Sequence, residues 1–324
     1  MPSLIAHSLA GEIALLKSDI SKLNQVIVRN KTQYFVGCQG PDIFLYYHNL
    51  PWQNHKSYKK IHHLASISHE EKINDCFISL LTQAKNTMDN SLISYVCGYM
   101  AHHCLDRNAH PYVYYCTDSC DKDISFSHQL FESQLDLGIL NEYKLDVNEY
   151  NITERVKKIK NKSSIVSSIV KMANDVYQCQ LTEKEVNDCL DDTAFVARFL
   201  RDPSGKKTKY ISVLEKMFSL EGLATSMIIP QEYDNSLDAM NYRCQQWCDP
   251  CDKNIKSNEG FVQLFNKAVN EIKIQLQLFE KYLFEDGDLK ELLSIIGDKS
   301  FATGKSGGSE MKFFKKDENS IQSL

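Results

Sequence analysis

The sequence contains few of the residues that break helices. Its 324 residues include only 7 prolines and 13 glycines, fewer than soluble proteins of this length commonly carry. Proline cannot continue a hydrogen-bonded helix or strand, and glycine weakens both. A chain with so little of either is typical of a helical protein rather than of one built from short strands and tight turns.

Long hydrophobic runs and a secretory leader are also missing. No stretch of 18 apolar residues occurs, so no transmembrane segment is predicted. Neither Lys nor Arg precedes the first apolar residues, and Glu12 interrupts them, a pattern that does not predict a signal peptide. The 11 cysteines are odd in number and widely spread along the chain. This pattern indicates free thiols in a reducing compartment rather than a disulfide scaffold. We therefore expect a cytoplasmic location.

The sequence also has no excess of positive charge. The formal net charge is -5 and the isoelectric point lies near 6.1. Bulk electrostatics give no reason to expect binding to a polyanion. Nucleic acid is therefore not the favoured partner, although a local basic patch would still allow it.

Helical periodicity dominates where the hydrophobic pattern is clear. Residues 153–200, 209–228 and 258–283 predict amphipathic helices, and Thr182 with Glu185 predicts a capping box. The fold class is therefore all-α, as a single large multi-helix domain over residues 1–303. Residues 304–324, rich in glycine, serine and charge, are expected to form a loosely structured tail.

The histidines are confined to one part of the chain. All ten lie between His7 and His128, and none follows although the chain continues to residue 324. Placement of this kind favours imidazole chemistry in the N-terminal part of the protein.

Two histidine–carboxylate pairs repeat a spacing of four residues. His102 and Asp106 lie on one face if their segment is helical, and His110 follows at the same interval, directly before Pro111. Because a helix usually ends before proline, we expect His110 in a last helical turn or a loop. His128 and Glu132 form the second pair.

Imidazole nitrogens and carboxylate oxygens are the ligands that borderline metals such as zinc take in proteins. Asp106, set between two histidines, can bridge two cations, and paired metals suit in-line attack on a phosphodiester. Any single pair of this kind is more often an incidental contact, but two pairs together with the restricted histidines favour a metal site.

The pattern His-x3-Asp-x3-His-Pro followed by His-x3-Glu, with Gly37-Cys38-Gln39-Gly40-Pro41-Asp42 and His7 upstream, resembles the zinc-dependent phospholipase C family, more distantly related to the P1/S1 nucleases. The resemblance implies two or three Zn²⁺ ions. One would be held by His102, Asp106 and His62, with His63 as the alternative. A second would be held by His110, His128 and Glu132, and a third by His7 together with Asp106. Asp42 would act as general base or orient the attacking water.

The other histidines are expected to lie outside the site. His48, His55 and His69 stand among polar residues and are predicted to be solvated. His103 points about 100° away from His102 on a helix and is expected in the core or behind the ligands.

The resulting hypothesis is a zinc-dependent phosphodiester hydrolase whose substrate is a phospholipid or a small phosphodiester. Two alternatives stay open, a non-catalytic metal-binding scaffold of the same fold and a nuclease-like phosphodiesterase. The sequence makes no prediction of the oligomeric state.

Overall fold

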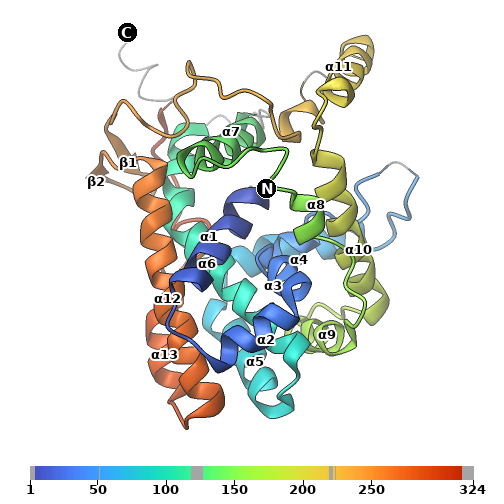
Figure 1. The fold of residues 1–324 in the computed structure, drawn as a ribbon, viewed down its shortest axis with the longest axis vertical. Coiled ribbons are helices and arrows are strands. Elements are labelled where there is room, and N and C mark those ends of the chain that lie inside the picture. The colour runs from blue at the N-terminus through green and yellow to red at the C-terminus, as the bar shows by residue number, and fades with distance from the viewer. Residues whose placement is uncertain (1–3, 51, 118–126, 219–221, 223, 316–324) are drawn as a thin grey trace.

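A computed structural model describes the chain except residues 1–3, 51, 118–126, 219–221, 223 and 316–324 (Figure 1). The described residues are 64% helical, with one small two-stranded sheet among them, which confirms the all-α prediction. In chain order the elements are α1 (Leu4–Lys17), α2 (Lys22–Arg29), α3 (Lys31–Gly37), η1 (Gly40–Phe44), α4 (Tyr58–Glu70), α5 (Ile73–Thr87), α6 (Asn90–Thr117), α7 (Ser127–Glu142), α8 (Ile152–Arg155), α9 (Ser163–Tyr177), α10 (Glu183–Leu200), α11 (Lys206–Phe218), η2 (Thr225–Met227), β1 (Trp247–Asp249), β2 (Asp252–Ser257), α12 (Phe261–Phe284) and α13 (Leu289–Ile296).

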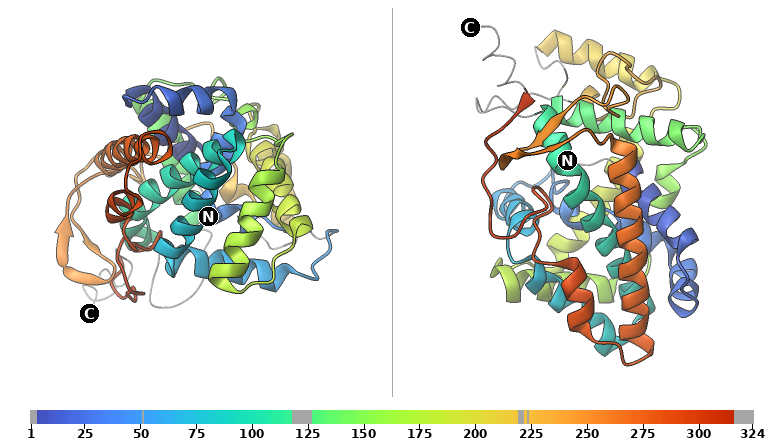
Figure 2. Two further views of the ribbon diagram at one scale, coloured as in Figure 1. Left: turned by 90° about the horizontal axis from the view of Figure 1, so that it is seen from below. Right: turned by 90° about the vertical axis from the view of Figure 1, so that its left-hand side faces the viewer.

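The central helix is α6. It is buried along most of its length, as a helix without a polar face must be. The amphipathic helix α12 lies beside it, and α1 and α3 pack on it as well (Figure 2). Residues on α6 are therefore shielded from water on several sides.

Two glycines bring α3 against α6. A side-chain carbon added at Gly37 would lie 2.1 Å from the carbonyl oxygen of Tyr95, and one at Gly98 would lie 2.1 Å from that of Tyr34. Only glycine permits backbones to approach this closely. The close crossing sets the position of η1, which follows α3 and carries Asp42.

The expectation that the helix ends before Pro111 is corrected by the structure, since α6 continues through Pro111 to Thr117. Proline deprives the carbonyl oxygen of Arg107, four residues earlier, of its helical partner. Gly304 packs against that oxygen, where an added side-chain carbon would lie 2.4 Å away. His110 thus sits inside a continuous helix, in register with His102 and Asp106.

The predicted helix over 153–200 is three helices, α8, α9 and α10. At the start of α10, Thr182 and Glu185 form the predicted capping box. The segment predicted over 209–228 corresponds to α11 and η2, and the segment predicted over 258–283 corresponds to α12. None of the described helices combines the length and hydropathy that a membrane span requires.

Residues 304–315, predicted as the start of a tail, run beside the antiparallel pair β1–β2. Lys305 pairs with Asp249 at 2.9 Å, the backbone N–H of Phe313 donates to the carbonyl of Pro250, and Phe314 is buried. Residues 316–324 lie outside the described part. The ten described cysteines are free thiols, and Cys120 lies outside the described residues.

Candidate metal centre

One face of α6 carries His102, Asp106 and His110, spaced by four residues. The neighbouring His103 points elsewhere, and its Nε2 donates to the carbonyl of Lys299 (2.7 Å). Burial lowers the pKa of His103 to about 3, so this ring is neutral. It belongs to the core, as predicted.

The carboxylate of Asp106 is the centre of the site. Its oxygens lie 2.9 Å from Nε2 of His102, 3.1 Å from Nε2 of His7 and 3.5 Å from Nε2 of His110. Burial alone would raise the pKa of Asp106, but the charges of His102, His110 and His7 outweigh it and hold the pKa well below its ordinary value. Three imidazoles thus surround the Asp106 carboxylate and favour its charged form.

His7 reaches this carboxylate because α7 holds the start of α1. Asp136 on α7 accepts hydrogen bonds from the backbone N–H groups of Ile5 (3.2 Å) and Ala6 (2.7 Å). These are free donors of a first helical turn, which a carboxylate satisfies. The His7 ring stacks on His102 with centroids 4.1 Å apart.

Asp42 enters from η1 and pairs with a histidine that was expected outside the site. Its Oδ1 lies 3.0 Å from Nε2 of His69 on α4, and its Oδ2 lies 3.9 Å from Nε2 of His102. Gly40 permits this approach, since it has a φ of +49° and an added side-chain carbon would lie 2.3 Å from the His102 ring. Burial would raise the pKa of Asp42, but the hydrogen bond with His69 and the charges of His102 and His69 lower it.

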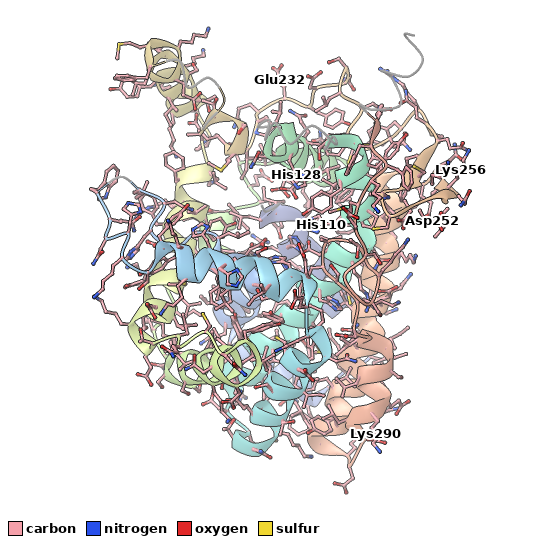
Figure 3. All side chains as sticks on the ribbon, turned by 180° about the vertical axis from the view of Figure 1, so that it is seen from behind. His110, His128, Glu232, Asp252, Lys256 and Lys290 are labelled. Carbon is pink, nitrogen blue, oxygen red and sulfur yellow. The ribbon has the colours of Figure 1, made fainter. Side chains whose placement is uncertain are left out.

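A second group joins α6 to α7. Oε1 of Glu132 lies 3.3 Å from Nε2 of His128 and 3.5 Å from Nε2 of His110. Figure 3 shows His110 and His128 close together on neighbouring helices. Burial would raise the pKa of Glu132, yet His128 and His110 contribute to lowering it well below its ordinary value. His110 thus links the two groups of ligands.

The protons of four imidazoles are placed on the nitrogen that faces away from the carboxylates. Nδ1 donates to a carbonyl oxygen of Cys38 in His102 (3.0 Å), of Ala65 in His69 (2.6 Å) and of Phe301 in His110 (3.0 Å). Nδ1 of His128 lies 3.0 Å from the hydroxyl oxygen of Thr117, which itself donates to a carbonyl. Since a carbonyl only accepts, Nδ1 carries a proton, and a ring with that single proton presents the lone pair of Nε2 to the carboxylates.

Lone pairs facing carboxylate oxygens at about 3 Å repel unless a proton or a metal cation lies between them. Zinc fits this need, because ligand atoms about 2.1 Å from a tetrahedral ion lie about 3.4 Å from one another. Among the described residues, His102 Nε2 and Asp106 Oδ2 are buried atoms without a hydrogen bond. Three groups offer ligand atoms that lie within 4.8 Å of one another: His7, His102 and Asp106; Asp42, His69 and His102; and His110, His128 and Glu132.

The structure brings together six of the seven predicted ligands and leaves out His62. His62 stacks on Tyr58 and its Nε2 lies 3.4 Å from the carbonyl of Tyr47. The expectation for His62 is corrected, as is the exclusion of His69. The two lie seven residues apart on one side of α4 and differ by about 10 Å along its axis. That spacing could have named His69 as an alternative to His62, but it does not choose between them.

The remaining histidines lie away from the candidate ligands. The alternative ligand His63 is exposed. His48 lies 3.6 Å from Asp188, and His55 lies 3.2 Å from the carbonyl of Leu50. None of them belongs to the three groups of candidate ligands.

A family model described as zinc dependent phospholipase C matches residues 1–183, which is more than half of the chain and contains every candidate ligand. The chain belongs to the zinc-dependent phospholipase C family. No curated protein and no solved structure matches it. The resemblance in the sequence is therefore confirmed, and zinc is the metal that this family implies for the histidine and carboxylate groups.

Residues beyond the part matched by the zinc-dependent phospholipase C family hold the candidate ligands from behind. The carbonyl of Phe301 fixes His110, and that of Lys299 fixes His103. Arg107 on α6 pairs with Glu271 on α12 at 2.7 Å. The C-terminal part of the chain thus orients ligands that the N-terminal part supplies.

Proposed function

We propose that this protein is a zinc-dependent phosphodiester hydrolase that cleaves a phospholipid or a related phosphodiester in the manner of a phospholipase C. The observation that carries the proposal is the common orientation of four imidazoles, each with Nδ1 engaged by an oxygen and Nε2 turned toward Asp42, Asp106 or Glu132. Such preset rings are characteristic of metal ligands.

The ligand groups would hold two or three ions. His69, His102, Asp42 and Asp106 would form one site, His110, His128 and Glu132 a second, and His7 with Asp106 a third. Bound zinc supplies a Lewis acid, which lowers the pKa of water toward about 7 and neutralises charge on a phosphoryl group.

The protein's own residues would direct the substrate to one edge of the centre. The side chains of His69, His110 and His128 are 15%, 12% and 14% exposed, whereas those of His102 and Asp106 are 0% and 2% exposed. The phosphodiester would therefore approach from the side of His69, His110 and His128. His102 and Asp106 would form the closed floor.

Asp42 would orient the attacking water rather than remove its proton completely. Its lowered pKa makes it a weak proton acceptor at neutral pH. Its two oxygens also differ, since Oδ1 is 3.0 Å from His69 whereas Oδ2 is 3.9 Å from His102. Oδ2 is the oxygen that would accept a hydrogen bond from water.

The test is hydrolysis of bis-p-nitrophenyl phosphate, followed by product analysis with phosphatidylcholine. We expect turnover that a chelator abolishes and zinc restores, and release of diacylglycerol with a phosphorylated head group. Asp42→Asn should slow turnover at least about 100-fold, whereas Asp191→Asn, a surface carboxylate on α10, should not. No turnover by the zinc-loaded chain on any phosphodiester would overturn the proposal and favour the scaffold alternative.

A further inference from the structure

The helix α11 exposes apolar side chains that a surface helix normally buries. Tyr210, Val213, Met217 and Phe218 are 68%, 64%, 66% and 64% exposed, whereas Glu215 is buried. Surface helices of soluble proteins ordinarily turn apolar residues inward and charged residues outward. Figure 1 shows α11 projecting from the body of the protein.

Polar contacts hold the inner side of α11 against the rest of the chain. Glu215 accepts hydrogen bonds from the backbone of Ala224 (2.5 Å) and Thr225 (3.0 Å) and from the Thr225 hydroxyl (2.6 Å). Asp202 accepts from the backbone and hydroxyl of Thr208 at 2.7 and 2.8 Å. These contacts fix which side of the helix faces outward.

Lysines border the outward apolar strip. Lys206 lies four residues before Tyr210, and Lys209 and Lys216 lie seven residues apart on one edge of the strip. All three are exposed. Among the described residues, the ion pairs formed by lysine and arginine involve none of these three lysines. Apolar and aromatic side chains edged by free lysines are the pattern of a helix that lies in the surface of an anionic membrane.

The chain segments on either side of α11 lie next to the candidate metal centre. The backbone N–H of Ile229 donates to the carbonyl of Leu200 at 3.1 Å, which closes the segment that carries α11. Leu200, Met227 and Ile229 line a small hollow together with Glu132. A surface bound by α11 would thus lie next to the candidate ligands.

We propose that α11 docks the protein on an anionic lipid surface, with Tyr210, Val213, Met217 and Phe218 inserted among the acyl chains and Lys206, Lys209 and Lys216 at the head groups. The inference deepens the proposed function, because it names a membrane as the place where the substrate is met. Binding itself requires neither zinc nor catalysis.

The test uses the full chain and vesicles of phosphatidylcholine with or without about 30% phosphatidylserine, with binding measured by flotation. We expect at least tenfold stronger binding to the anionic vesicles and weaker binding at high salt. The triple variant Tyr210→Ser, Val213→Ser, Met217→Ser should bind at least tenfold more weakly. Its matched control, Val28→Ser, Ile255→Ser, Ile274→Ser, removes three apolar side chains that are also exposed and should bind within twofold of the unmodified chain.

The role of charge is tested separately with the double variant Lys209→Glu, Lys216→Glu. Its control is the double variant Lys253→Glu, Lys256→Glu on β2, which changes the net charge equally. Only the α11 variant should lose at least tenfold in binding to anionic vesicles. Absence of vesicle binding, equal losses in variant and control, or self-association that the triple variant abolishes would each overturn the docking proposal.

Hydrolysis of bis-p-nitrophenyl phosphate, which is soluble, separates this proposal from the proposed function. The α11 variants should keep this activity. Vesicle binding through α11 by a chain without hydrolysis would support docking and refute the hydrolase, and hydrolysis without vesicle binding would do the opposite.

Discussion

His69 and His62 lie seven residues apart on the same side of α4, but only His69 reaches Asp42, with Nε2 3.0 Å from Oδ1. The two form a natural matched pair, since each substitution removes one imidazole from the same helix. His69→Ala should lower the zinc affinity of the site that His69 shares with Asp42 and His102 at least about tenfold, because a ligand is lost. His62→Ala should leave it unchanged. A chelator-competition titration measures both, and equal affinities would remove His69 from the centre.

Asp106 contacts three imidazoles, so its substitution should affect more than one ion. Asp106→Asn keeps the shape but removes the charge, and we expect loss of more than one zinc equivalent per chain. His103→Gln, one turn away but pointing into the core, should keep all zinc and lose about 1 kcal/mol of unfolding free energy. Elemental analysis and urea unfolding measure these effects. Full zinc content in Asp106→Asn would refute the bridging role.

Alanine substitutions at Gly40 and Gly205 distinguish backbone strain from a steric clash with the His102 ring. Gly40 and Gly205 have φ values of +49° and +65°, but an added side-chain carbon meets the His102 ring only at Gly40 and nothing within 4 Å at Gly205. Gly205→Ala should cost about 1 kcal/mol of stability and leave zinc binding intact. Gly40→Ala should cost more and weaken zinc binding, as urea unfolding and zinc titration would show. Equal effects of the two substitutions would mean that η1 does not support the site.

Zinc affinity should fall as the pH is lowered from 7.5 to 5.5. Each ligand imidazole must be neutral to bind, and the ordinary pKa of imidazole is about 6.5, so protons compete increasingly below that pH. The pKa values of Asp106 and Glu132 are lowered. The stability that their charge contributes is complete above about pH 5 and is lost only as the pH falls further, outside this window. Zinc titrations at each pH test the prediction, and a constant affinity would indicate binding by carboxylates alone.

The sequence predicts the parts of the site that are local. His102, Asp106 and His110 share a face because residues four apart do so on any helix, and the same holds for His128 and Glu132. The fold class follows from the scarcity of proline and glycine and from the helical periodicity. These inferences need no knowledge of how distant segments meet.

What the sequence could not predict depends on tertiary contacts. The choice between His62 and His69 depends on where α4 crosses η1, since both occupy one side of the helix. The continuation of α6 through Pro111 involves Gly304, nearly 200 residues away, which packs on the carbonyl that proline leaves free. The placement of His7 depends on Asp136 from α7.

The central claim is that the buried histidines and carboxylates form a multinuclear zinc centre. Its most direct test is the zinc content per chain, by elemental analysis of the purified protein without a histidine tag, before and after dialysis against a chelator. We predict two or three equivalents that the chelator removes and added zinc restores. Fewer than two equivalents after zinc is supplied would contradict the account.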